Sequence, residues 1–191
     1  AAGASPGANF VVMRLKRALW GSGSYNGAMG IDKRSGGAAS NSNQTEGVDG
    51  KFVWFKNFIL NGYAAQNRTL GYSGGQSNLG AGLNFRSNWL DFEAEHRKIG
   101  PNFNPAVGFL ERTDCICDFA DATFKTRPQF WGLRELQFEG FLFHGPDTHH
   151  VVQTQEWQTT FRATFHNGSY TDNDIVDVFA QRLTTPFNIY K

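Results

Sequence analysis

Apolar residues recur at every second position in about ten segments of the chain, which is the repeat of a half-buried strand, and hardly any segment keeps the 3.6-residue repeat of a helix. The segment 157–165 is the clearest example, because its odd positions are Trp, Thr, Phe or Ala and its even positions are Gln, Thr or Arg. The pattern predicts an all-β fold. The expected strands are 11–16, 25–31, 48–55, 58–65, 79–85, 90–95, 115–124, 136–143, 157–165 and 175–183.

The connections between these strands alternate in length. The short ones are 21–24, 56–57, 86–88, 125–129 and 167–172, and the longer Gly-, Ser- and Asn-rich ones are 35–47, 68–77, 99–104 and 145–150. An antiparallel meander then has short turns at one end and long loops at the other, which is typical of transmembrane β-barrels with strands of about 9–11 residues. A soluble lipocalin-like barrel can alternate in the same way.

Large aromatic residues gather beside the short turns. Four tryptophans lie there, namely Trp20, Trp54, Trp89 and Trp131. Indole rings favour a membrane interface, where an apolar body and a polar tip are both accommodated. These residues therefore predict an interfacial belt, although aromatic rings could instead close the bottom of a soluble core.

Charged residues occupy the second face of several strands. In a membrane barrel they line a wet lumen, and the candidates are Arg14, Lys16, Asp91, Glu93, Glu95, Arg97, Glu156 and Arg162. In a soluble barrel the same pattern is inverted, with the apolar face inward and the charges in water. Periodicity alone does not distinguish these two arrangements.

Composition narrows the function classes. The 191 residues carry 18 Lys and Arg against 17 Asp and Glu, so the net charge of +1 provides no field for binding nucleic acid. Eighteen Phe, five Trp and five Tyr are too many large rings for a disordered chain. No apolar run approaches the about 20 residues that a transmembrane helix needs. We expect a single β domain over residues 1–191, or a fragment of a larger barrel.

One string of residues is more specific. After Gly100 and Pro101 come Asn102, Phe103, Asn104, Pro105, Val107, Gly108 and Phe109, followed by Arg112, Thr113 and Asp114. This motif resembles a bacterial outer-membrane-type family in which a sandwich similar to family-9 carbohydrate-binding modules precedes a C-terminal β-barrel. Only the barrel portion resembles this chain. The resemblance implies a location in the bacterial outer membrane, lipid as a partner, and glycans or other envelope proteins as further partners.

Three other groups of residues suggest chemistry. Asp91, Glu93 and Glu95 could form a paired-acid hydrolase site, but their alternation also fits solvated lumen residues. His144, Asp147 and the pair 149–150 could bind a metal loosely, although adjacent residues of a strand point to opposite faces. Two cysteines at 115 and 117 would share one strand face, and we expect free thiols because a bridge across so short a loop is strained.

The sequence therefore predicts an antiparallel meander of about ten strands that forms part or all of an outer-membrane β-barrel. The expected role is anchoring, or passive passage of solutes or glycans, without bond chemistry and without a cofactor. The alternatives are a soluble β-barrel that binds an apolar ligand, and a glycan-acting hydrolase. Nucleic acid is not an expected partner.

Overall fold

The chain forms an all-β structure. The computed structural model describes residues 7–20, 23–35, 42–110, 112–128 and 130–182, and within these ranges it contains strands and no helix. The strands are β1 (Ala8–Ala18), β2 (Tyr25–Ser35), β3 (Ser42–Trp54), β4 (Phe58–Thr69), β5 (Ser77–Arg86), β6 (Leu90–Ile99), β7 (Cys115–Thr126), β8 (Leu133–Pro146), β9 (Val152–Phe165) and β10 (Tyr170–Gln181). The ten expected strands are confirmed, and most of them are longer than the apolar alternation indicated.

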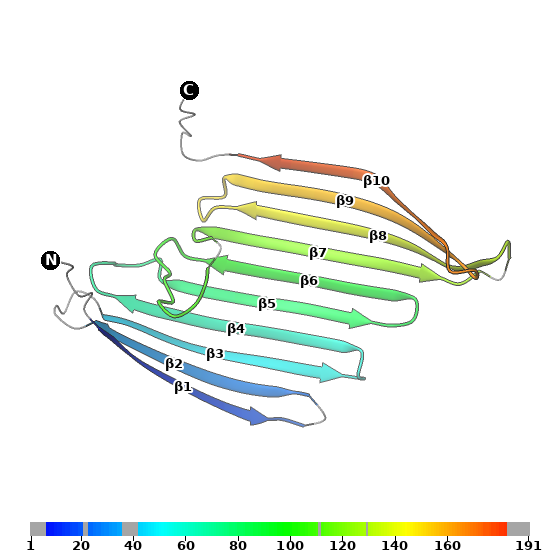
Figure 1. Cartoon of the computed structure of the whole chain (residues 1–191). Coiled ribbons are helices and arrows are strands. Elements are labelled where there is room, and N and C mark those ends of the chain that lie inside the picture. Colours follow the sequence, from blue (N-terminus) through cyan, green and yellow to red (C-terminus); the bar gives the residue numbers. More distant parts are fainter. Residues whose placement is uncertain (1–6, 21–22, 36–41, 111, 129, 183–191) are drawn as a thin grey trace. The chain divides into compact units, whose positions relative to one another are not determined.

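The strands form one antiparallel sheet in chain order, from β1 to β10 (Figure 1). In such a meander, alternate connections lie at the same end of the sheet. The connections 19–24, 55–57, 87–89, 127–132 and 166–169 share what we call the turn end. The connections 70–76, 100–114 and 147–151 share the loop end, and the longest of all, 100–114, is among them.

One expected loop is wrong. Residues 35–47 were expected to be a long connection, yet β2 continues through Ser35 and β3 already begins at Ser42; the intervening residues 36–41 lie outside the described part of the chain. The start of β3 has no large apolar residue, so apolar alternation could not detect it. Pairing with β2 and hydrogen bonds of polar side chains stabilise this stretch instead, as Lys33 opposite Asn43 illustrates.

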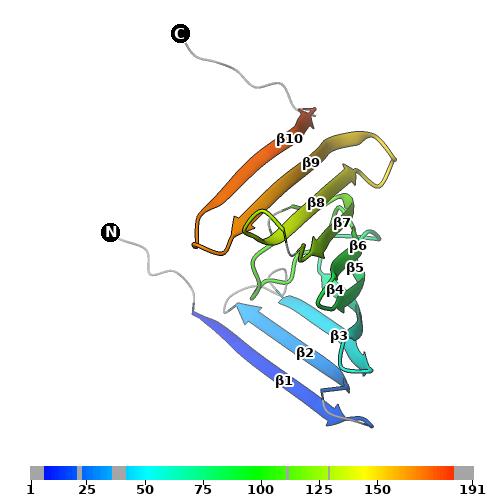
Figure 2. The ribbon, with the colours of Figure 1, turned by 90° about the vertical axis from the view of Figure 1, so that its right-hand side faces the viewer.

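The chain divides into two compact units that are each described separately. Unit 1 comprises Ala1–Val53, Leu60–Ala81 and Arg97–Cys115, and unit 2 comprises Trp54–Ile59, Gly82–His96 and Ile116–Lys191. In unit 1, β1, β2 and β3 run side by side (Figures 1 and 2). In unit 2, β8, β9 and β10 do the same, and the β9–β10 turn lies opposite the β8–β9 loop (Figure 2).

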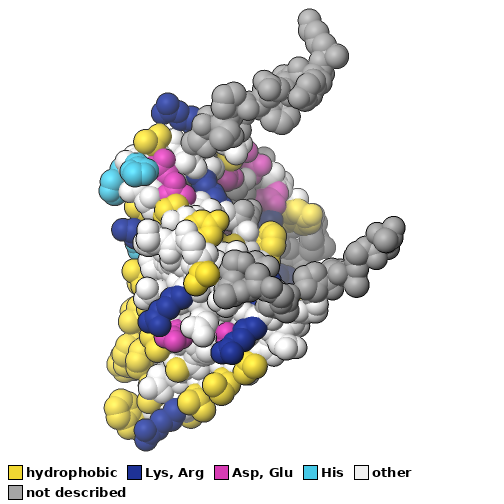
Figure 3. Space-filling view, turned by 90° about the vertical axis from the view of Figure 1, so that its left-hand side faces the viewer, with side chains coloured by type: hydrophobic (Ala, Val, Ile, Leu, Met, Phe, Trp, Pro, Cys, Tyr) yellow, Lys and Arg dark blue, Asp and Glu magenta, His cyan; other side chains and the backbone are white. Residues whose placement is uncertain are grey.

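Strand register defines two faces in unit 1 that differ in polarity around Leu15, whereas nearer the loop end Asp32 and Glu46 lie on the face of Leu15 and Val12 and Ile31 lie on the other face. Residues directly opposite each other in paired strands point to the same side of a sheet. Leu15, Ala28 and Val48 are opposite one another across β1, β2 and β3, so they belong to the apolar face. Their neighbours Lys16 and Asp49 belong to the other, polar face. In the lower part of Figure 3, hydrophobic side chains line one margin of this unit.

Unit 2 has the same two faces. On its apolar face, Leu142 of β8 is opposite Trp157 of β9, and Phe138 is opposite Phe161. The rings of Phe138 and Phe161 have centroids 4.9 Å apart. On its polar face, Arg162 of β9 is opposite Gln137 of β8 and Asp172 of β10.

The apolar faces do not form an enclosed core. Among the described residues, the buried hydrophobic side chains are Ile99, Phe103, Cys115 and Ala163, whereas Leu15 on the apolar face is 75% exposed. Polar residues are buried as well, including Asn43, Thr45 and Asn67. The described residues include no helix with the length and apolar character needed to cross a membrane.

Candidate functional site

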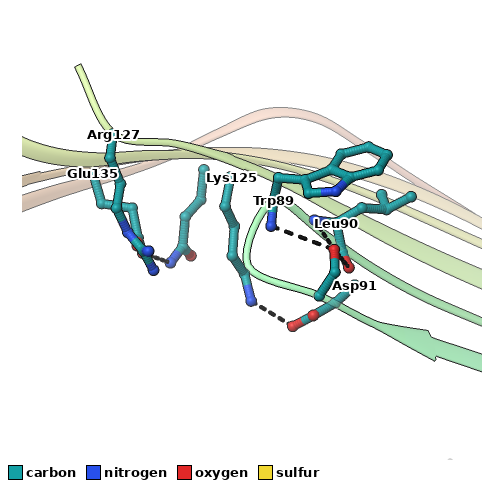
Figure 4. A network of polar contacts seen from close by, with 8 residues as sticks. Trp89, Leu90, Asp91, Lys125, Arg127 and Glu135 are labelled. Carbon is teal, nitrogen blue, oxygen red and sulfur yellow. Dashed lines mark hydrogen bonds and ion pairs between the residues drawn. The ribbon is translucent and has the colours of Figure 1, made fainter. Parts of the chain in front are cut away.

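Charged residues near the turn end of unit 2 form a network on the polar face. Lys125 of β7 forms an ion pair with Asp91 of β6 (Figure 4). In the next turn, Arg127 donates from Nε to Oε2 of Glu135 at 2.9 Å, and Gln137 donates from Nε2 to the other carboxylate oxygen at 2.6 Å. Side chains from β6, β7, the following turn and β8 therefore converge on one level of the sheet.

The same face continues onto β9 and β10. Arg162 donates from Nε to Oδ2 of Asp172 at 3.1 Å, and Thr160 donates from Oγ1 to Oδ1 of Asp174 at 3.1 Å. The predicted lumen residues Asp91 and Arg162 thus both take part in ion pairs on the polar face, with partners that the sequence reasoning did not identify.

The polar face of unit 2 is strongly acidic. On β6 to β10 its carboxylates are Asp91, Glu93, Glu95, Asp121, Glu135, Glu139, Glu156, Asp172, Asp174 and Asp177. Among the described residues, the cations that share this face are Lys125, Arg162 and, from the turn after β7, Arg127, and Arg97 of β6 has the same alternation but belongs to unit 1. A surface with this balance attracts small cations and repels anions.

The polar face of unit 1 carries basic residues instead. Arg14 binds Asp49 through both guanidinium nitrogens, at 2.6 and 2.7 Å. The Nζ atom of Lys16 lies 3.6 Å from the centre of the Tyr25 ring, a cation–π contact. Arg97, near the end of β6, is a third predicted lumen residue in this unit, after Arg14 and Lys16.

The motif 102–109 lies in the β6–β7 connection, which begins by crossing back to the β4–β5 loop (Figure 1). The backbone nitrogen of Gly100 donates to the carbonyl of Ser77 at 2.8 Å, and that of Asn102 donates to Gly75 at 2.9 Å. A Cβ atom on Gly100 would lie 2.2 Å from the Gly75 carbonyl oxygen, so only glycine permits this approach.

Two buried asparagines then hold Asn104 against the polar face of unit 1. Asn43 of β3 donates from Nδ2 to the Asn104 carbonyl at 2.8 Å, and Asn67 of β4 accepts from the Asn104 backbone nitrogen at 3.2 Å. Both asparagines also donate to Oγ1 of Thr69, at 2.7 and 2.9 Å. Phe103, the residue before Asn104, is buried. Sequence reasoning missed Asn43 and Asn67, because isolated asparagines in polar segments carry no periodic signal.

The rest of the motif is less tightly held. Phe109 is 92% exposed and Val107 is half exposed. Asn104 also stabilises the loop locally, since its side-chain Oδ1 accepts from the backbone nitrogen of Ala106 at 3.1 Å. Arg112, Thr113 and Asp114 precede the first residue of β7.

The predicted aromatic residues lie at the turn end. Trp20 and Trp131 are 90% and 88% exposed, and Trp89 stacks edge-on against Phe124 of β7 with centroids 6.3 Å apart. Trp54 ends β3 and contacts Phe58 across the turn at 5.9 Å. A fifth tryptophan, Trp157, lies at the other limit of the apolar face.

A polar row crosses the apolar face of unit 2 near the loop end. Asp118 of β7 is opposite His144 of β8, which is opposite Gln155 of β9. The Nδ1 atom of His96 lies 2.5 Å from Oδ1 of Asp118. Trp157 is the next residue on the same face of β9, so an aromatic ring borders this row.

The expectation of free thiols is wrong. Cys115 and Cys117 are the two cysteines of the chain, and both are disulfide-bonded. They share the polar face of β7 with Phe119, which explains the blurred alternation of this segment. The expected placement of both thiols on one strand face fits β7, but the expectation that strain would prevent a bridge between them is wrong.

The histidine-rich loop is organised by its aspartate. The carboxylate of Asp147 accepts from the backbone nitrogens of His149 and Val151, each at 2.9 Å, and from the side chain of Gln153 at 3.2 Å. These hydrogen bonds lower the pKa of Asp147 below its usual range, and the one from Val151 has the largest effect. The described residues hold no cluster of three or more His, Cys, Asp or Glu side chains suited to a metal ion.

Comparison with protein-family models, curated protein sequences and solved structures gives no match.

Proposed function

We propose that the chain is part or all of an outer-membrane β-barrel, with its apolar face toward lipid and its polar face toward an aqueous lumen. Its role would be anchoring and the passive passage of small polar solutes. The observation that carries this proposal is the burial pattern: large apolar side chains are exposed, whereas amides and hydroxyls form the buried cluster of unit 1. The two faces of a membrane barrel are arranged in this way.

A soluble alternative accounts poorly for the same observation. Soluble monomers rarely expose a continuous apolar patch of more than a few hundred Å². The apolar face of β1 alone presents Val11, Met13 and Leu15, each more than half exposed, and that of β10 presents Val176 and Val178. In a soluble barrel these side chains would instead be enclosed around an apolar ligand. Finding them enclosed in this way would overturn the proposal.

The dimensions of the apolar face also support the proposal. On β9 this face extends from Phe165 at the turn end to Trp157, which is eight residues or about 27 Å along the strand. A strand tilt of about 40° reduces this to roughly 21 Å across the sheet, close to the apolar band of about 25 Å in membrane barrels.

Both limits of the band have interfacial character. Exposed rings of Trp20 and Trp131 lie at the turn end, and Trp157 borders the polar row of Asp118 and His144 near the loop end. Aromatic girdles at both membrane interfaces are a feature of transmembrane barrels. The disulfide adds support for an exported protein, since disulfides persist in oxidising compartments such as the periplasm.

The proposal is tested in two steps. The protein is folded in detergent and its migration in SDS is compared with and without boiling, since a closed barrel is expected to resist SDS until it is heated. The folded protein is then added to a planar bilayer and its conductance is recorded. Faster migration of the unboiled sample together with ion conductance would support the proposal. Identical migration, with a folded protein in detergent-free buffer, would overturn it.

A further inference from the structure

We propose that residues 100–104, the first part of the β6–β7 connection, form a fixed constriction of the lumen, and that Asn43 and Asn67 are the positioning residues that set the size limit of passing solutes. This inference rests on the proposed passage function and adds a named determinant of solute size. The part of the connection that carries it is residues 100–104, which we call the anchored segment.

The anchored segment is attached at successive points. The backbone nitrogen of Gly100 donates to Ser77 at the start of β5 and that of Asn102 to Gly75 in the β4–β5 loop, and the Asn102 side chain donates to the Gly74 carbonyl at 3.1 Å. Asn104 then binds Asn43 through its carbonyl and Asn67 through its backbone nitrogen. Apart from the bond of the Asn102 side chain, these contacts use backbone atoms of the segment, so the path of the chain itself is held.

The two asparagines are specialised for this contact. Asn67 is fully buried and Asn43 is 5% exposed, so each amide has lost water and depends on its protein partners. Thr69 accepts from both amides, and Thr45 donates to Oδ1 of Asn43 at 3.2 Å. Fixed amides of this kind hold a segment in one position, whereas exposed side chains would let it move over the face.

The position of the segment determines its effect on passage. The side chains of Asn43 and Asn67 point from β3 and β4 to the polar face, which faces the lumen in the proposed function. Backbone bound to these side chains occupies lumen space at the loop end. Loops folded inward narrow or plug the lumen of other membrane barrels.

The decisive variant is Asn43→Asp. It keeps the size of the side chain but replaces the amide donor with a carboxylate oxygen that faces the Asn104 carbonyl. We expect the ratio of docked to released segment to fall by about tenfold to hundredfold, which corresponds to about 1.4 to 2.8 kcal/mol. Asn67→Ala should act in the same direction. The matched control is Asn61→Ala, six residues earlier on the same strand and face as Asn67.

Two readouts separate docking from passage. Limited trypsin digestion reports release of the loop through cleavage at Arg112, and liposome swelling with sugars of increasing size reports the size limit. The inference expects faster cleavage and entry of larger sugars for Asn43→Asp, and wild-type behaviour for Asn61→Ala. Faster cleavage with an unchanged size limit would overturn it. Absence of sugar entry for every variant, including the wild type, would instead overturn the passage function itself.

Folding failure of the strand variants would not end the test. Phe103→Ala changes only the connection and removes its buried ring, so β3 and β4 keep their own residues. It should release the segment in the same two assays. A cleavage rate and size limit that both remain at wild-type values for Phe103→Ala and Asn67→Ala would overturn the inference.

Discussion

Replacing Phe161 with arginine tests the orientation of the two faces directly. Phe161 lies on the apolar face of β9, four residues from Phe165 at one limit of the band and four from Trp157 at the other. It therefore occupies the middle of the band, about 14 Å along the strand from either limit. In a membrane barrel, this position is close to the bilayer midplane.

The expected cost follows from this depth. An arginine on the lipid face costs about 2–4 kcal/mol at the midplane and about 0–1 kcal/mol near an interface. Phe161→Arg also removes the ring contact with Phe138, which is worth about 0.5–1.5 kcal/mol beyond its buried area. The sum is about 2.5–5.5 kcal/mol. The same substitution at Trp157 or Phe165 should cost much less, because arginine can reach the headgroups from there.

The assay is equilibrium unfolding by urea in lipid vesicles, followed by tryptophan fluorescence and by heat-dependent migration in SDS. The matched control is Thr160→Arg, which places the same side chain one residue away, on the polar face beside Asp174. We expect this control to unfold within about 1 kcal/mol of the wild type, since single surface ion pairs contribute little. Unfolding of the Trp157 variant is followed by migration in SDS alone, because the substitution removes one of the tryptophans that the fluorescence signal reports.

The depth profile decides between the orientations. A cost that is highest at Phe161, low at Phe165 and absent at Thr160 agrees with lipid around the apolar face. Equal costs at Phe161 and Phe165, together with a protein that folds without lipid, would refute the reasoning. An arginine at Thr160 that costs as much as one at Phe161 would do so as well, because the two residues point to opposite faces.

Three further predictions follow from single contacts. The pKa of Asp147 is lowered, so the stabilisation that its carboxylate gives the β8–β9 loop is complete above the ordinary aspartate value of about 3.9. This stabilisation is lost as the pH falls through the lowered pKa, and hydrogen exchange of the loop amides should show the loss. Asp147→Asn should remove this pH dependence. Alkylation of the unfolded, unreduced protein should label neither Cys115 nor Cys117, and both after reduction, whereas labelling before reduction would contradict the disulfide. The acidic polar face of unit 2 should make conductance cation-selective, and the double variant E93Q/D121N should shift the reversal potential toward zero in a salt gradient. An unchanged reversal potential would mean that Glu93 and Asp121 do not determine the ion selectivity.

Much of the fold could be predicted from the sequence, because strand periodicity is local. The segment 157–165 alternates without interruption, and β9 covers all of it. Apolar alternation cannot detect a strand segment that contains no large apolar residues. For this reason the first residues of β3 were expected to be a loop. What makes that stretch a strand is its pairing with β2 and the burial of Asn43 and Thr45 under a connection that comes sixty residues later.

The candidate site was harder to predict for the same physical reason. Arg14 and Arg162 could be placed on a polar face from local alternation, but their partners Asp49 and Asp172 lie on other strands. Register between strands decides such pairs, and register depends on turns and bulges rather than on composition. Asn67 shows the limit most clearly, since its burial and its contact with Asn104 arise from tertiary structure and have no signal in the local sequence.

The burial pattern has a consequence for how this sheet is stabilised. Hydrophobic burial is the dominant favourable contribution to folding in water, and it depends on apolar surface that leaves the solvent. Among the residues that the structure describes, the side chains with almost no exposure are Asn67 and Cys115, while Leu15 and Trp157 remain exposed. Hydrogen bonds contribute only about 0.5–1.5 kcal/mol each after the loss of water, so the asparagine cluster cannot replace a core. The missing stabilisation must come from whatever covers the apolar face, and in the proposed membrane barrel a lipid phase would provide it along the whole band at once.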